Sequence, residues 1–267
     1  MFYYLRLLKQ VFKISFSSFL MYRSNVIFFL IFETLFFVTS FIVADSGVKF
    51  AGGSIQGWNA NDVFLLTSFN NVTHQIFVVF FIGGLFGIPY DVTTGKMDYT
   101  LLKPLRPLVG IFATHEFVIS NVPSFILSVG TFFYFAFRAD THWSGQNTLI
   151  FIALFFLACA VRFALALLTL APCFVSEKLD DSQNTYWNVA SLSRFPTSIY
   201  PRALQIIFSS LFPLALVATV PCAVILNKDL TIPLIWSFGG CVGFFIVAYS
   251  IFRICLRYYK SVNAGIN

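Results

Sequence analysis

Long runs of apolar residues dominate this sequence of 267 residues. A helix needs about 20 apolar residues to cross the hydrocarbon core of a bilayer. Six runs reach this length, at residues 24–44, 62–88, 107–137, 147–174, 205–227 and 232–252. Because the runs are continuously apolar and do not alternate with polar residues, they predict six spanning helices rather than the strands of a membrane barrel.

The composition supports this prediction. Hydrophobic residues make up 58% of the chain and charged residues only 10%, whereas soluble domains carry about 25% charged residues. Such a chain cannot cover the surface of a soluble fold, which excludes a secreted disulfide scaffold, a disordered regulator and a free nucleic-acid-binding domain. We therefore predict an all-α polytopic membrane protein in which residues 1–267 form a single transmembrane domain.

The basic residues predict the orientation of the chain. Cytoplasmic loops of membrane proteins are enriched in Lys and Arg. Of the 17 Lys and Arg residues, 13 lie in the N-terminal segment, the second and fourth loops and the C-terminal tail, three lie in the other loops, and Arg162 lies within a run. This distribution predicts that both termini are cytoplasmic. It also accounts for the net charge of +6 without a nucleic-acid partner.

Residues 1–22 differ in kind from the apolar runs. Arg6, Lys9, Lys13 and Ser17 recur every three to four residues among apolar side chains. This pattern is typical of an amphipathic helix that lies in the membrane interface. The alternative is a slightly long first span, but three cations on one stripe would be costly inside lipid. We therefore predict an interfacial helix.

The polar segment 176–204 leaves two topologies open. In the first, the segment is cytoplasmic and precedes a fifth span at residues 205–227. In the second, part of the segment crosses as a helix buried in protein, and residues 205–227 form an external hairpin. Pro213 and Pro221 would permit such a broken helix. Both topologies keep the C-terminus inside.

Three charged side chains, Glu33, Glu116 and Arg162, lie within predicted spans. Counted at 1.5 Å per residue, all three lie about 14–18 Å from the inner ends of their spans. An unpaired charge at that depth costs at least about 2.5–3.5 kcal/mol. We therefore expect Arg162 to pair with Glu116 or with Glu33, either as an ion pair that locks the bundle or as part of a translocation path.

A belt of polar residues interrupts the second run. It consists of Asn70, Asn71, His74 and Gln75. Polar side chains inside a membrane bundle either line a path or join helices by hydrogen bonds. The sequence leaves both uses open.

The second loop, residues 89–106, predicts a short amphipathic helix. Asp91 or Thr93 can begin the helix, and Pro104 ends it. Such a helix on the cytoplasmic face is suited to docking in a groove on a partner protein. The alternative is a simple connecting loop that rests on lipid headgroups.

No enzyme is predicted from this chain. Gly95-Lys96 is followed by Met97, where a phosphate-binding loop requires Ser or Thr. The three His and five Cys residues have neither catalytic nor metal-ligand spacing. A pump built from this chain therefore depends on an associated ATPase or on an ion gradient.

Two motifs resemble the ABC-2 family of ABC-exporter permeases, in the bacterial branch that lacks a fused ATPase. The first is GKMDYTLLKPL at residues 95–105, and the second is FPTSIYP at residues 195–201. The resemblance implies a type V ABC-exporter fold in which the loop at 89–106 is the coupling helix. The implied contacts with the ATPase are Lys96, Met97, Asp98, Tyr99, Leu101 and Leu102.

The resemblance also implies the partners. Two copies of an ABC ATPase would hold ATP and Mg, with no cofactor in this chain. A second permease chain, identical or related, would complete the transporter in the bacterial cytoplasmic (inner) membrane. The cargo is not specified by any residue. The competing hypothesis is an ion-coupled secondary transporter that uses Glu33, Glu116 and His74, although the internal symmetry frequent in such transporters is not evident.

Overall fold

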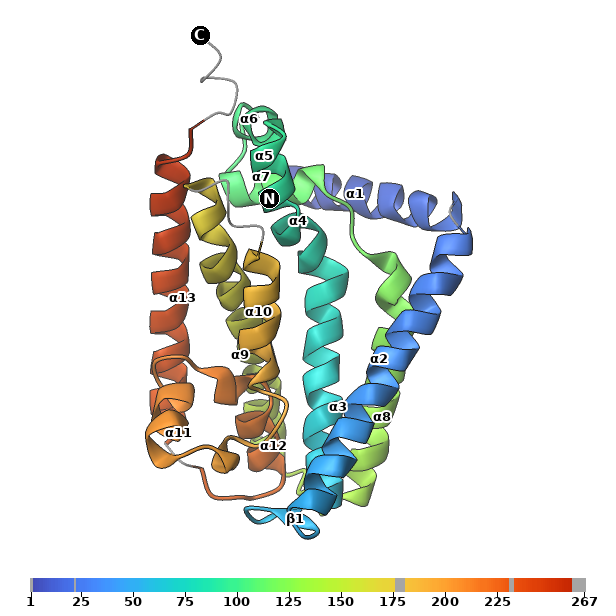
Figure 1. Cartoon of the computed structure of the whole chain (residues 1–267), viewed down its shortest axis with the longest axis vertical. Coiled ribbons are helices and arrows are strands. Elements are labelled where there is room, and N and C mark those ends of the chain that lie inside the picture. The colour runs from blue at the N-terminus through green and yellow to red at the C-terminus, as the bar shows by residue number, and fades with distance from the viewer. Residues whose placement is uncertain (1, 22, 176–180, 231–232, 261–267) are drawn as a thin grey trace.

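The computed structural model of the chain describes residues 2–21, 23–175, 181–230 and 233–260 (Figure 1). The long helices are α1 (Phe2–Met21), α2 (Arg23–Phe50), α3 (Ala60–Phe77), α8 (Val122–Arg138), α9 (Gly145–Leu170) and α13 (Leu234–Arg257). The shorter helices are α4 (Gly83–Phe86), α5 (Ile88–Thr93), α6 (Lys96–Leu101), α7 (Pro107–Thr114), α10 (Ser182–Ser191), α11 (Arg202–Ser209) and α12 (Thr219–Ile225). The π-helix η1 (Val78–Ile82) joins α3 to α4, and the 3₁₀ turns are η2 (Ile119–Asn121), η3 (Ala171–Phe174), η4 (Thr197–Ile199) and η5 (Leu214–Val217).

The described residues contain five helical stretches that are long and apolar enough to cross a membrane. They are Leu30–Phe50, Ala60–Thr93, Ile119–Arg138, Gly145–Phe174 and Leu234–Arg257. Figure 1 shows these stretches running along one common direction. The all-α membrane fold is therefore confirmed, but the described residues contain five candidate spans where the sequence predicted six.

Helix α9 is the centre of the bundle. It packs against α3, α10, α12 and α13, and its residues Leu154, Ala158, Val161, Ala164 and Leu165 are fully buried. Small side chains on this helix allow neighbouring backbones to approach closely, which is how membrane helices pack in the absence of a hydrophobic driving force. In contrast, α2 and α13 leave most of their apolar side chains exposed.

Helix α1 lies across one end of the bundle, at a large angle to α2 (Figure 1). The basic residues Arg6, Lys9 and Lys13 are exposed, whereas Val11 and Ser15 are buried against the bundle. The helix therefore lies across the bundle with its basic residues outward, and its place in the membrane interface, predicted for residues 1–22, stays a prediction. The end of α13 and the short helices α5 and α6 lie at this same end of the molecule (Figure 1).

The predicted span at 107–137 is wrong in its first part. Helix α7 ends at Thr114, and the candidate span begins only at Ile119. Pro123 explains the restart, because a proline inside a helix loses its own hydrogen bond and clashes with the carbonyl of the residue four positions earlier. A continuous helix through Ile119 and Pro123 is therefore disfavoured, and Pro123 lies in the first turn of α8 instead.

Neighbouring elements satisfy the backbone of the break between α7 and η2. The N–H of Val118 donates to the carbonyl oxygen of Val79 in η1, at 3.1 Å. The N–H of Phe117 donates to the hydroxyl of Ser15 in α1, at 2.8 Å. Backbone that leaves the helical conformation beside packed helices requires such partners, because an unpaired N–H group away from water is costly. The break is thus held by the interfacial helix on one side and by the π-helix on the other.

Two glycines make room for this break. A Cβ atom placed on Gly83 would overlap the carbonyl oxygen of Glu116, and one on Gly87 would overlap the imidazole of His115. Gly83 and Gly87 have the spacing of the small-residue motif that brings membrane helices together. Here the two glycines leave room for the non-helical segment 115–118 of the same chain, instead of for a second helix.

The predicted continuous span at 205–227 is also wrong. Helix α11 ends at Ser209, and η5 and α12 follow as separate short turns. Pro213 lacks the N–H that a continuous helix needs, and α12 is buried against α3 and α9. Figure 1 shows α11 and α12 at the end of the molecule opposite α6, and the chain runs toward that end along α10. The structure therefore favours the second topology, although residues 176–180 of the preceding segment lie outside the described residues.

A short hairpin closes this opposite end. Strands β1 (Ser54–Ile55) and β2 (Trp58–Asn59) pair antiparallel, with Ile55 facing Trp58 in register. Lys228, which follows α12, lies 2.9 Å from the carboxylate of Asp62 at the start of α3. It also donates a 2.6 Å hydrogen bond to the carbonyl of Gly57 in the turn. These two contacts of Lys228 tie the end of the 205–227 segment to the start of α3.

The close approach at Gly83 generates a testable prediction. We expect Gly83→Ala to destabilise the chain by about 1–3 kcal/mol, because the added methyl group meets backbone that cannot rotate away. Thermal unfolding in detergent measures the effect. The matched control is Gly239→Ala in α13, where a Cβ atom meets nothing within 4 Å. Equal stability of the two variants would contradict the packing described for the break.

Candidate functional site

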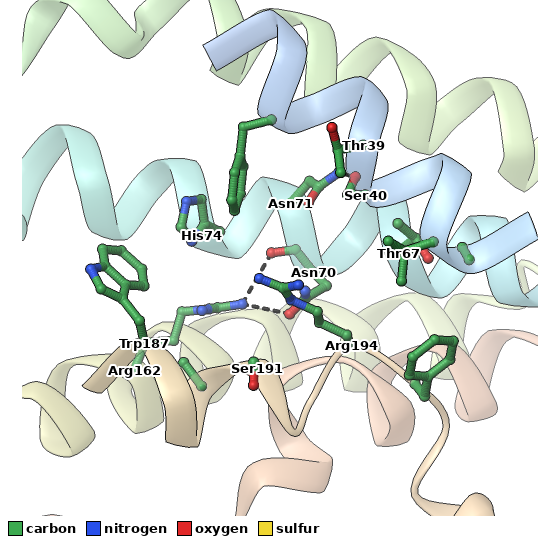
Figure 2. A pocket seen from close by; sticks show the side chains of 15 residues that line it. Thr39, Ser40, Thr67, Asn70, Asn71, His74, Arg162, Trp187, Ser191 and Arg194 are labelled. Atoms are coloured by element: carbon green, nitrogen blue, oxygen red, sulfur yellow. Dashed lines mark hydrogen bonds between the residues drawn. The ribbon is translucent and has the colours of Figure 1, made fainter. Parts of the chain in front are cut away.

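A small, partly open cavity of about 70 Å³ lies between α2, α3, α9, α10 and the segment that follows α10 (Figure 2). Its polar and charged lining consists of Thr39, Ser40, Thr67, Asn70, Asn71, His74, Arg162, Ser191 and Arg194. Its aromatic lining consists of Phe36, Trp187 and Phe195. The cavity combines the two features of a ligand site, mostly apolar walls and a few convergent polar groups.

Arg162 enters the cavity from α9 and is only 3% exposed. Its Nε–H donates to the hydroxyl of Thr73 at 3.0 Å. One terminal nitrogen donates to both the carbonyl oxygen and the side-chain oxygen of Asn70, at 3.1 and 2.5 Å (Figure 2). Within the described part of the chain, no Asp or Glu lies at ion-pair distance from Arg162. The expected pairing of Arg162 with Glu116 or Glu33 is therefore wrong.

The two glutamates are engaged elsewhere. Glu33 accepts a 3.0 Å hydrogen bond from the amide of Gln75, and the oxygen of that amide accepts from Asn121 at 3.4 Å. Glu116 accepts a 3.1 Å hydrogen bond from Ser18 of α1. The break at residues 115–118 explains the difference, because Glu116 lies in non-helical backbone beside α1 rather than inside a straight helix. The three charges therefore do not meet.

The four residues of the predicted polar belt of α3 fall into two groups, and the lining of a path stays a prediction. Asn70, Asn71 and His74 line the cavity, while Gln75 joins α3 to α2 through Glu33. Asn71 also donates to the hydroxyl of Ser40 at 2.9 Å. The imidazole of His74 lies between two aromatic rings, at 5.9 Å from the ring of Phe36 and 5.3 Å from that of Trp187.

Arg194 is a cavity residue that the sequence did not reveal. It follows α10, is exposed, and its guanidinium lies 5.8 Å from the centroid of the Phe36 ring. In the sequence it counts among the basic residues of a predicted cytoplasmic segment. Only the second topology, which buries part of 176–204 in the bundle, could have placed Arg194 beside the polar belt. Figure 2 shows Arg162 and Arg194 entering the cavity from different elements.

Helices α5 and α6 form a second candidate site, which projects at the end of the molecule where α1 lies (Figure 1). The predicted single helix from Asp91 or Thr93 to Pro104 is instead two short helices. Gly95 separates them in the left-handed region, with φ of 72°, a conformation that favours glycine. The candidate span that begins at Ala60 continues through α5 to Thr93, so α5 is a direct extension of a spanning helix.

The predicted ATPase contacts differ in their exposure. Lys96, Tyr99 and Leu102 are exposed, with Tyr99 at 73% and Leu102 at 81%. Asp98 and Leu101 are half-buried, and Met97 is fully buried. Met97 therefore cannot contact a partner in this conformation and instead anchors α6 to the bundle.

Tyr90 adds an exposed aromatic ring that the sequence did not single out. It is 58% exposed and lies under the ammonium of Lys96, at 4.8 Å from the ring centroid. We refer to Tyr90, Lys96, Tyr99 and Leu102 as the α5–α6 surface. Ile88 and Met97, which lie beneath this surface, are fully buried. We refer to this buried side of α5 and α6 as the α5–α6 base.

Direct contacts link the α5–α6 base to the rest of the bundle. The imidazole of His115, just after α7, lies 3.4 Å from the carboxylate of Asp91 in α5. Gln183 of α10 donates a 2.9 Å hydrogen bond to the carbonyl of Phe86 in α4. The rings of Phe86 and Trp187 lie 5.4 Å apart. Since Trp187 also lines the cavity, α10 contacts both candidate sites.

Comparison with known proteins identifies one family. The model of a family described as ABC-2 family transporter protein matches residues 28–263. The match includes all five candidate spans, the α5–α6 surface and the cavity residues. No significant match was found among curated proteins or among solved structures.

The hydrogen bonds of Arg162 predict unequal effects of two neighbouring asparagines. We expect Asn70→Ala to cost about 2 kcal/mol of stability, because it removes the side-chain acceptor of a buried guanidinium and charge-assisted hydrogen bonds are the stronger ones. Asn71→Ala is the matched control, and it removes one neutral hydrogen bond that is worth about 1 kcal/mol or less. Thermal unfolding of the purified chain compares them. Equal losses would show that Asn70 does not stabilise the charge of Arg162.

Proposed function

The chain belongs to the ABC-2 family of transporters, and from this premise we propose that it is the permease subunit of an ATP-driven ABC exporter. In this proposal a separate ATPase subunit binds the α5–α6 surface, and the chain itself hydrolyses no ATP. ATP and Mg are held by two copies of the ATPase. A second permease chain, identical or related, completes a transporter of the type V fold.

The observation that carries the proposal is the exposure of apolar and aromatic side chains on a packed base. Tyr90, Tyr99 and Leu102 are each more than half exposed, whereas Ile88 and Met97 beneath them are fully buried. Exposed apolar side chains gathered on a rigid element are typical of a surface that docks another protein. A loop that only rested on lipid headgroups would not need a base anchored in the core.

The same contacts give a route from an ATPase to the cavity. A displacement of α5 acts on α3, which it extends, and on the residue after α7 through Asp91 and His115. A displacement of α4 acts on α10 through Phe86 and Gln183. Because α3 and α10 both line the cavity, ATP-driven movement of the α5–α6 surface would reshape it.

The orientation follows from the same proposal. ATP is a cytoplasmic fuel, so the α5–α6 surface, α1 and the end of α13 would face the cytoplasm, in agreement with the distribution of Lys and Arg. The hairpin and α11 would then face the outside of a bacterial inner membrane. The exposed apolar face of α2 would meet lipid or the second permease chain.

The competing ion-coupled mechanism has less support. It requires Glu33, Glu116 and His74 to act together on a coupling ion. In the described structure each is engaged by a different neighbour, Glu33 by Gln75, Glu116 by Ser18 and His74 by aromatic rings. We therefore retain the ATP-driven mechanism as the proposal.

Attachment of the ATPase can be tested by single substitutions. We expect Leu102→Asp and Tyr99→Asp to lower the ATPase activity that co-purifies with the chain by at least about tenfold, since a charge in the centre of an apolar contact costs more than 1.4 kcal/mol of binding. The matched control is Phe50→Asp, because Phe50 is 97% exposed at the far end of α2. The control should retain the activity.

Two results would contradict the proposal. One is unchanged ATPase co-purification in both α5–α6 variants. The other is transport by the purified chain alone, in liposomes that hold an ion gradient and no ATP, which would favour the ion-coupled mechanism.

A further inference from the structure

We propose that the cavity between α2, α3, α9 and α10 binds the acidic head of an anionic amphiphile, and that Arg162 and Arg194 hold that head. The inference rests on the proposed function and deepens it, because it names the chemical class of ligand that the permease would accept. The acidic head is a phosphate-type group. The molecule that carries it is either a membrane lipid or a water-soluble amphiphile.

The first argument is the charge of the cavity. Two guanidinium groups face it, and the described residues that line it include no Asp or Glu. Neutral oxygens of Asn70 and Thr73 satisfy hydrogen bonds of Arg162, but neutral acceptors do not cancel a positive charge. Cations within membrane spans are costly and mark functional sites by default. An anion in the cavity would supply the missing charge.

The second argument is the availability of Arg194. It is exposed, and its guanidinium lies over the face of the Phe36 ring. A cation–π contact uses the flat face of the guanidinium and leaves the N–H edge free to donate. The N–H edge of an arginine matches two oxygens of a phosphate group. Arg162, held in place by Asn70, would contribute fixed positive charge to the same head group.

The third argument is the nature of the walls. Phe36, Trp187 and Phe195 line the cavity together with aliphatic side chains of α2. A small inorganic anion would gain nothing from these apolar walls, whereas the chain of an amphiphile would be buried against them. The cavity, at about 70 Å³, is smaller than a site for a whole organic ligand, so it would hold the head while the chain lies along its opening. The combination of two cations and aromatic walls therefore selects an anionic amphiphile.

The proposal is tested by native mass spectrometry of the full chain in detergent. The probes are dioleoyl phosphatidylglycerol, dodecyl phosphate and, as the zwitterionic control of zero net charge, dioleoyl phosphatidylcholine. We expect one or both anionic probes to bind at least about tenfold more tightly than phosphatidylcholine. Binding of phosphatidylglycerol alone identifies the membrane lipid as the source, and binding of dodecyl phosphate alone identifies a soluble amphiphile. Either result supports the proposal.

Variants locate the binding in the cavity. We expect Arg194→Gln to weaken anionic binding by about tenfold or more, since it removes a pair of charge-assisted hydrogen bonds. The matched control Arg202→Gln removes the same charge from an exposed residue at the start of α11 and should leave binding unchanged. Arg162→Gln is measured as well, and thermal unfolding checks that this variant folds. If it does not fold, the Arg194→Gln variant alone decides the test, because Arg194 is exposed.

The proposal is overturned if phosphatidylcholine binds as tightly as both anionic probes, or if Arg194→Gln and Arg202→Gln bind them equally. Because the assay contains no ATPase, failure here leaves the proposed coupling through the α5–α6 surface untouched. Failure of that coupling would equally leave the binding result in place.

Discussion

Backbone that leaves the helical conformation among apolar helices must find hydrogen-bond partners in the protein, and the break at residues 115–118 depends on this constraint. The N–H groups of Val118 and Phe117 reach Val79 in the π-helix and Ser15 in α1, and Gly83 gives the segment space. The π-helix is part of the same arrangement, because Val79 in it supplies one of these acceptors. Such irregular turns are frequent at functional sites. One short segment thereby joins the interfacial helix, the α3 span and the base of α5, and it defines the end of the molecule from which the α5–α6 surface projects.

The two candidate sites are linked by packing rather than by proximity in the sequence. Helix α10 contacts the α5–α6 base through Gln183 and lines the cavity through Trp187. Packed interiors shift between discrete arrangements rather than deforming continuously, so a partner that displaces α5 would change the cavity as a unit. The buried charge of Arg162, fixed by Asn70, keeps the cavity cationic in the arrangement described here. A transporter that must both hold and release an acidic ligand needs these two properties together.

The sequence predicted the parts of this structure that depend on long apolar periodicity. The membrane bundle, the amphipathic pattern of α1 and the presence of a short helical loop at 89–106 follow from composition and pattern, whereas the burial of Met97 does not. The breaks were harder. The run at 107–137 reads as continuous although Pro123 lies within it, and the broken helix that Pro213 and Pro221 permit at 205–227 was one of two open topologies. The partner of Arg162 could not be predicted, because depth along a straight helix misplaces Glu116 once the helix is broken. Arg194 was missed because its segment is polar, and polarity alone does not distinguish a loop from the lining of a cavity.

The central claim is that the α5–α6 surface is available to a cytoplasmic ATPase. The most direct test is the sidedness of Tyr99, measured with a membrane-impermeant maleimide on Tyr99→Cys in a chain whose native cysteines are replaced. We predict labelling in inverted membrane vesicles and none in intact cells, with the reverse pattern for Phe50→Cys at the far end of α2. Labelling of Tyr99→Cys from outside intact cells would place the α5–α6 surface beyond the reach of ATP and contradict the account.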